Sequence, residues 1–150
     1  MKRLIIYFLF SFFVFSNAYA KNFNQTIQKY LENNKGNTEM VYAFNRCAAV
    51  FTYVATKLFN EPNQKERALN LVKLSSKSSE LAAGIHSKYN KKTLNESLRM
   101  SESRMMELDK LYRQDGEEYF NKNGRFFSPV ILDDLQYCTN EIVELINSGY

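Results

Sequence analysis

Apolar positions along most of this chain recur at steps of three and four residues, the spacing of one face of an α-helix. The pattern is clearest near the end of the chain, where Ile131, Leu135, Cys138, Ile142 and Leu145 form one stripe. No stretch of similar length alternates apolar and polar residues with a period of two, so β-strands are not expected. The pattern therefore predicts an all-α fold.

Residues that start and end helices divide this pattern into segments. Thr93 and Glu96 form a capping box, and Pro62 and Pro129 each follow a polar residue, as expected for the first turn of a helix. Three glycines follow periodic segments, where a left-handed residue ends a helix: Gly36, Gly124 and Gly149. The predicted helices cover residues 23–34, 38–59, 62–89, 94–123 and 129–147.

Short connections between these helices indicate antiparallel neighbours in a small bundle of four main helices plus a short N-terminal helix. Gly116 interrupts the fourth predicted helix, residues 94–123. Glycine inside a helix costs about 1 kcal/mol relative to alanine, so we expect a kink or a break there. The chain shows no internal repeat and no low-complexity linker, which favours one domain over residues 21–150.

The first twenty residues have a different character. Lys2 and Arg3 precede an apolar run at residues 4–15, and the small-residue pattern Ala18-Tyr19-Ala20 follows. This arrangement is typical of a secretory signal peptide over residues 1–20, cleaved before Lys21. The apolar run is shorter than the roughly 20 residues that span a bilayer, so an uncleaved anchor is the weaker alternative. We expect a periplasmic or secreted protein with no stable membrane anchor after cleavage.

Charge and length narrow the classes of function. The 150 residues carry a formal net charge of +4. Removal of residues 1–20 also removes Lys2 and Arg3, which leaves 130 residues with a net charge of +2. A nearly neutral chain of this length is a poor match for a nucleic-acid binder or a multi-domain enzyme.

Two cysteines, Cys47 and Cys138, lie on the apolar faces of two predicted helices. Oxidising compartments form and maintain disulfides, so we expect one bond between the second and fifth helices. Free or intermolecular thiols are the alternative. Neither cysteine has a second one at a metal-ligand or C-x-x-C spacing, so we expect no metal site and no cofactor.

Residues that could carry catalysis are few. The single histidine, His86, lies near the end of the third helix, where a surface or capping role suits the helix dipole. Asp133 and Asp134 fall in the first turn of the last helix and are expected on its solvated face. No nucleophile-and-base motif is present. We therefore predict no catalytic residues.

Two features could support binding. Small residues at positions 75–76, 78–79 and 82–84 predict either close helix packing or a cavity between helices for a small apolar ligand. In the connection before Pro129, we expect Phe127 to pack next to the cap residue Ser128, which leaves Phe126 exposed beside Arg125. The alternative is that both rings are buried. Aromatic residues and arginine are enriched in binding hot spots, so Arg125 and Phe126 are the candidate partner contact.

These observations favour a non-catalytic exported protein that binds an envelope or extracellular protein, as an inhibitor, immunity factor or chaperone does. The alternative is a carrier of a small apolar ligand inside the bundle. An enzyme without a recognisable motif is the third hypothesis.

Overall fold

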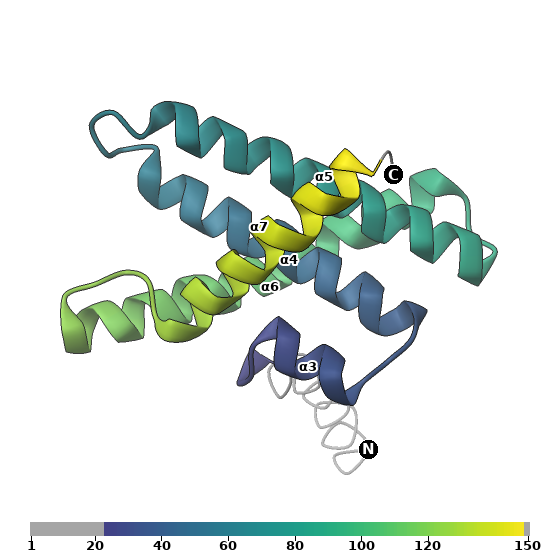
Figure 1. Ribbon diagram of the computed structural model, residues 1–150, viewed down its shortest axis with the longest axis horizontal. Helices are drawn as coiled ribbons and strands as arrows, with labels where there is room; N and C mark the ends of the chain where they lie inside the picture. Colours follow the sequence, from purple (N-terminus) through teal and green to yellow (C-terminus); the bar gives the residue numbers. More distant parts are fainter. Residues whose placement is uncertain (1–22, 149–150) are drawn as a thin grey trace, which may run out of the picture.

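The computed structural model describes residues 23–148, which form an all-α bundle without a strand in that range (Figure 1). This confirms the predicted fold class. The helices are α3 (Ile27–Asn33), α4 (Asn37–Leu58), α5 (Lys65–Asn90), α6 (Leu94–Asn123) and α7 (Pro129–Asn147). The predicted signal peptide, its cleavage site and Gly149 lie outside the described residues.

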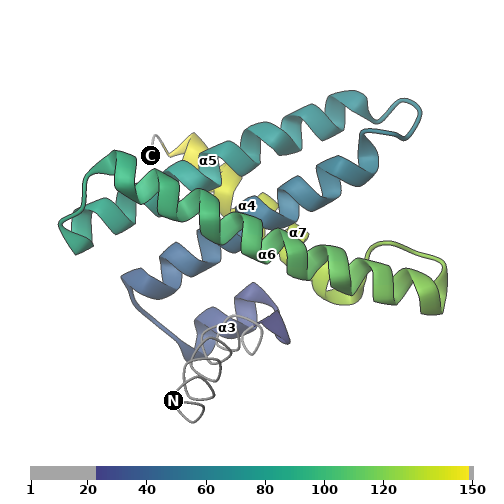
Figure 2. The ribbon, with the colours of Figure 1, turned by 180° about the vertical axis from the view of Figure 1, so that it is seen from behind.

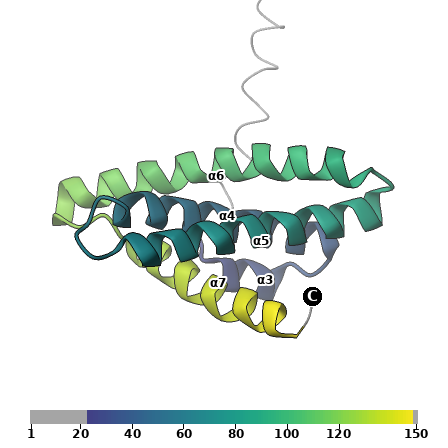
Figure 3. The same ribbon diagram turned by 90° about the horizontal axis from the view of Figure 1, so that it is seen from above.

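The helices form three layers around α4. Seen from above, α6 forms one outer layer, α4 and α5 lie beneath it, and α3 and α7 lie on the opposite side (Figure 3). α7 crosses in front of α4 in Figure 1, whereas α6 is in front in the view from behind (Figure 2). Helix α4 thus has neighbours on both faces and packs against each of the other four helices.

The central place of α4 follows from its sequence. Every residue from position 41 to 51 is buried, and most of them are apolar. A helix that is apolar on all sides has to be surrounded by other elements. Arg46 is the one charged residue in this stretch, and it is fully buried.

The disulfide predicted from helical phase is confirmed. Cys47 on α4 and Cys138 on α7 are bonded, with their Cα atoms 5.4 Å apart and 91 positions between them in the chain. Both residues are buried within the apolar core. The bond joins the central helix to the last helix.

Three of the predicted helix ends are confirmed. The Thr93 amide donates to Glu96 Oε2 at 3.0 Å, and the Glu96 amide donates to Thr93 Oγ1 at 3.2 Å, which completes the capping box of α6. Gly124 ends α6 in the left-handed region with φ 67°. Pro129 is the first residue of α7, and Ser128 Oγ accepts from the Ile131 amide at 3.3 Å.

Three other predicted boundaries are wrong, one of them the start of the first helix, which lies at Ile27 and not at residue 23. Helix α5 begins at Lys65 because Pro62 belongs to a turn, in which the Gln64 amide donates to the Glu61 carbonyl at 3.2 Å. Asn63 has φ 64°, which a helix cannot accommodate. Gly36 does not end the first helix; it is the N-cap of α4, with φ 153°.

The break considered at Gly116 does not occur, because α6 continues through this residue. Gly116 is buried against Tyr53 of α4, whose hydroxyl donates to the Phe126 carbonyl at 2.9 Å. A Cβ on Gly116 would lie 1.9 Å from Tyr53 Oη and 2.8 Å from the Phe126 oxygen. Glycine is required here by close packing.

We expect Gly116→Ala to lower the free energy of unfolding by about 1–3 kcal/mol, because overpacking and the displaced Tyr53 outweigh the gain in helix propensity. Chemical denaturation measures this loss. Gly84→Ala is the matched control, since a Cβ at Gly84 in α5 meets nothing within 4 Å. That substitution should raise stability by about 0.5–1 kcal/mol. Similar effects at both positions would contradict the packing role of Gly116.

Within the described range, no helix has both the length and the apolar character needed to cross a membrane.

Candidate functional site

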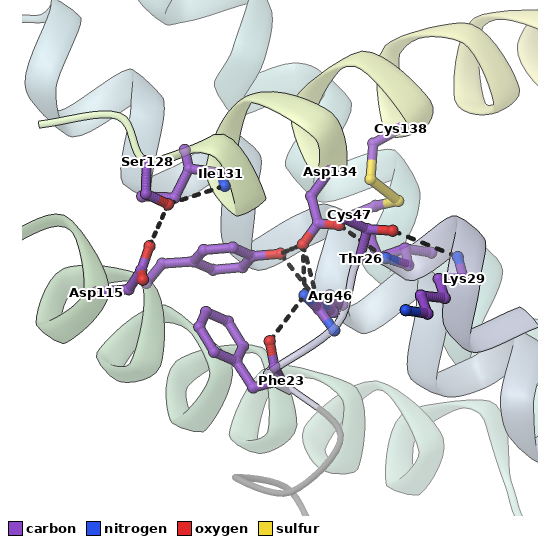
Figure 4. A network of polar contacts seen from close by, with 12 residues as sticks. Phe23, Thr26, Lys29, Arg46, Cys47, Asp115, Ser128, Ile131, Asp134 and Cys138 are labelled. Carbon is purple, nitrogen blue, oxygen red and sulfur yellow. Dashed lines mark hydrogen bonds and ion pairs between the residues drawn. A yellow bond between two sulfur atoms is a disulfide. The ribbon is translucent and has the colours of Figure 1, made fainter. Parts of the chain in front are cut away.

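A cluster of buried polar side chains lies where α3, α4, α6 and α7 meet (Figure 4). Arg46 Nη2 forms an ion pair with Asp134 Oδ2 at 2.7 Å, and both side chains have no exposed surface. The Tyr112 hydroxyl donates to the same Asp134 oxygen at 2.5 Å, while the Ile27 amide donates to Oδ1 at 2.7 Å. One carboxylate therefore connects four helices.

Burial sets the electrostatics of this cluster. It raises the pKa of Asp134, against the opposing effects of Arg46 and the hydrogen bonds to the carboxylate. Burial also raises the pKa of Tyr112 well above its usual value, so its hydroxyl keeps the proton that it donates. The Arg46 guanidinium donates to the Phe23 carbonyl at 3.4 Å and lies 4.8 Å from the centre of the Phe23 ring. With its charges paired and enclosed, the cluster stabilises the fold and offers no surface to a partner.

This cluster corrects the prediction that Asp134 is solvated. Asp134 is fully buried, whereas Asp133 beside it is exposed as expected. The carboxylate of Asp134 reaches Arg46, which lies 88 positions away in the chain. Arg46 was not among the residues predicted from the sequence. A lone charge inside an apolar stretch is nevertheless a usable signal, because a buried charge needs a partner.

His86 is likewise buried, with 8% of its surface exposed, so its predicted surface position is wrong. Its Nδ1 lies 3.2 Å from Ser97 Oγ on α6, which packs against the end of α5. Burial lowers the pKa of His86, and the nearby charges of Arg104 and Lys92 lower it further. Because Ser97 has no exposed surface, the pair satisfies two buried polar groups at a helix interface.

The small residues of α5 pack closely against its neighbours. Ser75 Oγ donates to the Ala48 carbonyl on α4 at 2.9 Å, and Ser101 Oγ on α6 donates to the Ser79 carbonyl at 3.2 Å. The Met105 sulfur lies 3.8 Å from Ser75 Oγ, so this side chain occupies the space beside the serines. The contacts favour close packing over a ligand cavity at this position.

The connection between α6 and α7 separates its two phenylalanines. Phe127 is half-buried and packs edge-on against Tyr53, with ring centroids 6.3 Å apart. Phe126 is 38% exposed, and Arg125 beside it is exposed. Burial of both rings, the alternative considered for this connection, does not occur.

Phe126 belongs to a layered arrangement of exposed side chains. Its ring stacks on Phe120 of α6 at a centroid distance of 4.2 Å and an interplanar angle of 7°. Lys57 Nζ of α4 lies 4.1 Å from the Phe126 centroid and covers the other face of the ring. We call Lys57, Phe120, Arg125 and Phe126 the Phe126 surface.

The backbone beneath the Phe126 surface is held from both sides. Tyr53 donates to the Phe126 carbonyl, and Ser128 Oγ donates to the Asp115 carboxylate on α6. Ser128 also caps α7 and is buried. The Phe126 ring is therefore presented from an ordered backbone, which reduces the conformational entropy lost when a partner binds.

In the part of the chain that the structure describes, no group of three or more His, Cys, Asp or Glu side chains is arranged to hold a metal ion.

No protein family model, no curated protein and no solved structure matches this chain.

Proposed function

We propose that this protein is an exported, non-catalytic binding module that uses the Phe126 surface to contact another protein in the cell envelope or outside it. The observation that carries this proposal is the stacked, exposed pair of Phe120 and Phe126 on a backbone held in place by Tyr53 and Ser128. Covering such rings with a partner removes apolar surface from water. An inhibitor, an immunity factor and a chaperone all work by contacts of this kind.

The charges of the Phe126 surface indicate what the partner offers. Lys57 lies over the Phe126 ring, and Arg125, the residue before Phe126, is exposed. A partner that combines an apolar patch with carboxylates would cover the rings and pair with both cations. Arginine and aromatic residues are the types that most often dominate binding energy at interfaces.

We expect Phe126→Ala to weaken partner binding by at least about 1–2 kcal/mol, or roughly 5- to 30-fold, while the melting temperature barely changes. The ring is exposed, so its removal opens no core cavity. Immobilised chain of residues 21–150 is used to capture a partner from envelope extract. Surface plasmon resonance with the purified partner then compares the variants.

Tyr89→Ala is the matched control for this experiment. Tyr89 is 54% exposed at the end of α5, with Lys88 Nζ 5.6 Å from its ring centroid. This pair resembles Lys57 and Phe126, but the end of α5 and the α6–α7 connection lie at opposite ends of the bundle (Figure 1). Binding should survive this substitution. If both variants lose binding equally, or if Phe126→Ala lowers stability as much as binding, the Phe126 surface is not the contact.

Export is supported by two observations of different kinds. The start of the chain has the pattern of a signal peptide, and the Cys47–Cys138 bond is of a type maintained in oxidising compartments. We expect the exported form to begin at Lys21, and intact mass spectrometry measures this directly. A product that retains residues 1–20 would replace this proposal with a membrane-anchored form.

A further inference from the structure

Three hydroxyl groups surround the sulfur atom of Met105 at the interface of α4, α5 and α6. The Met105 Sδ atom lies 3.9 Å from Thr52 Oγ1, 3.8 Å from Ser75 Oγ and 3.9 Å from Ser79 Oγ. A thioether sulfur is a weak hydrogen-bond acceptor. The Met105 sulfur is therefore surrounded by more hydrogen-bond donors than a weak acceptor needs.

The three hydroxyls differ in their other partners. Thr52 and Ser75 both donate to the Ala48 carbonyl, at 3.0 and 2.9 Å. Within residues 23–148, the Met105 sulfur is the only hydrogen-bond partner of the Ser79 hydroxyl. Ser79 is 8% exposed, so water does little to compensate for this weak acceptor. A stronger acceptor on the sulfur would satisfy the Ser79 hydroxyl better than the thioether does.

We propose that Met105 is a site of reversible oxidation to methionine sulfoxide by hydroperoxides. A sulfur lone pair attacks one oxygen of the peroxide, and the S–O bond forms as the O–O bond breaks. With hydrogen peroxide, the second oxygen leaves as water, the sulfur is oxidised by two electrons and the peroxide is reduced. The new sulfoxide oxygen accepts the Ser79 hydroxyl.

The surroundings of Met105 are what make this product compatible with the fold. A sulfoxide in an apolar core disrupts packing, because its polar oxygen finds no hydrogen-bond donor there. Met105 is half-buried and Ser79 is buried beside it, so we expect a small peroxide to reach the sulfur in the folded protein. The next residue, Met106, is 59% exposed and has no hydrogen bond among the described contacts. If Met106 is oxidised, its sulfoxide oxygen faces water, so we expect the helix interfaces to stay unchanged.

The experiment uses the chain of residues 21–150 with its disulfide intact and with Met40, Met100 and Met106 replaced by leucine, so that Met105 alone reports. Hydrogen peroxide should add one oxygen at Met105 in the folded protein, as shown by peptide mass mapping. The melting temperature should fall by no more than about 3 °C. Methionine sulfoxide reductase should restore the starting mass.

Ser79→Ala in the same background tests whether Ser79 supports the sulfoxide or whether Met105 is oxidised merely because it is accessible. Oxidation should then lower the melting temperature by at least about 5 °C more than in the parent, because the sulfoxide has lost its buried donor. The control is Ser78→Ala, since Ser78 donates to the Leu74 carbonyl at 2.8 Å and not to sulfur. Oxidation should lower the melting temperature of this variant by the same amount as that of the parent. The proposal is overturned if Met105 resists oxidation in the folded protein, if oxidation unfolds the parent, or if both serine variants respond alike.

Discussion

Replacement of Asp134 by asparagine is expected to lower the free energy of unfolding by about 3–5 kcal/mol, because it leaves the charge of Arg46 buried without a counter-ion. Both side chains of this pair have no exposed surface. The substitution also weakens the acceptor for the Tyr112 hydroxyl and the Ile27 amide, which connect α6 and α3 to α7. Denaturation by guanidinium chloride, with the disulfide intact, measures the loss.

Asp133→Asn is the matched control, since this neighbouring carboxylate is exposed on the same helix. Its effect should stay within about 0.5 kcal/mol. Substitution of both partners, Arg46→Met with Asp134→Leu, should recover part of the loss because no unpaired charge remains buried. Equal effects of Asp133→Asn and Asp134→Asn would show that the buried pair does not stabilise the fold as described here.

Cys138→Ser should cost about 2–5 kcal/mol, the range for native disulfides in small secreted domains. The bond spans 91 positions of the chain, and chain-entropy arguments give about 4–5 kcal/mol for a loop of that size. Thermal and chemical denaturation of the oxidised parent and the variant give the difference.

The double variant, Cys47→Ser with Cys138→Ser, tests whether the loss comes from the bond itself. It should be about as stable as Cys138→Ser alone, because the first substitution already removes the cross-link. Peptide mapping without reduction should recover Cys47 and Cys138 in one linked pair. Alkylation of both thiols in the folded, unreduced protein would contradict the bond.

Part of the Phe126 surface could be predicted from local sequence. A serine before a proline indicates a helix start, and the residue before such a cap tends to pack on the helix that follows. That rule placed Phe127 inside and Phe126 outside, as the structure shows. Phe120 and Lys57 were not predicted to join Phe126, because they come from α6 and α4 and meet it only through tertiary packing.

The sequence by itself determined the features that depend on local spacing. Helical periodicity predicted the all-α fold and the inward phase of both cysteines, and the capping box predicted where α6 begins. These properties come from residues within one or two turns of each other. Turn chemistry was less decisive at Pro62, because proline suits both the first turn of a helix and the second position of a β-turn.

Only the tertiary structure decided which polar groups lose contact with water. Asp134 was expected on a solvated face of its helix, but it lies beyond the first turn of α7 and is buried in an ion pair with Arg46 of another helix. His86 is buried because α6 brings Ser97 over the end of α5, and Gly116 is required because Tyr53 crosses it. Each outcome depends on which surfaces of distant elements meet, and a pattern that repeats every three or four residues carries no information about that.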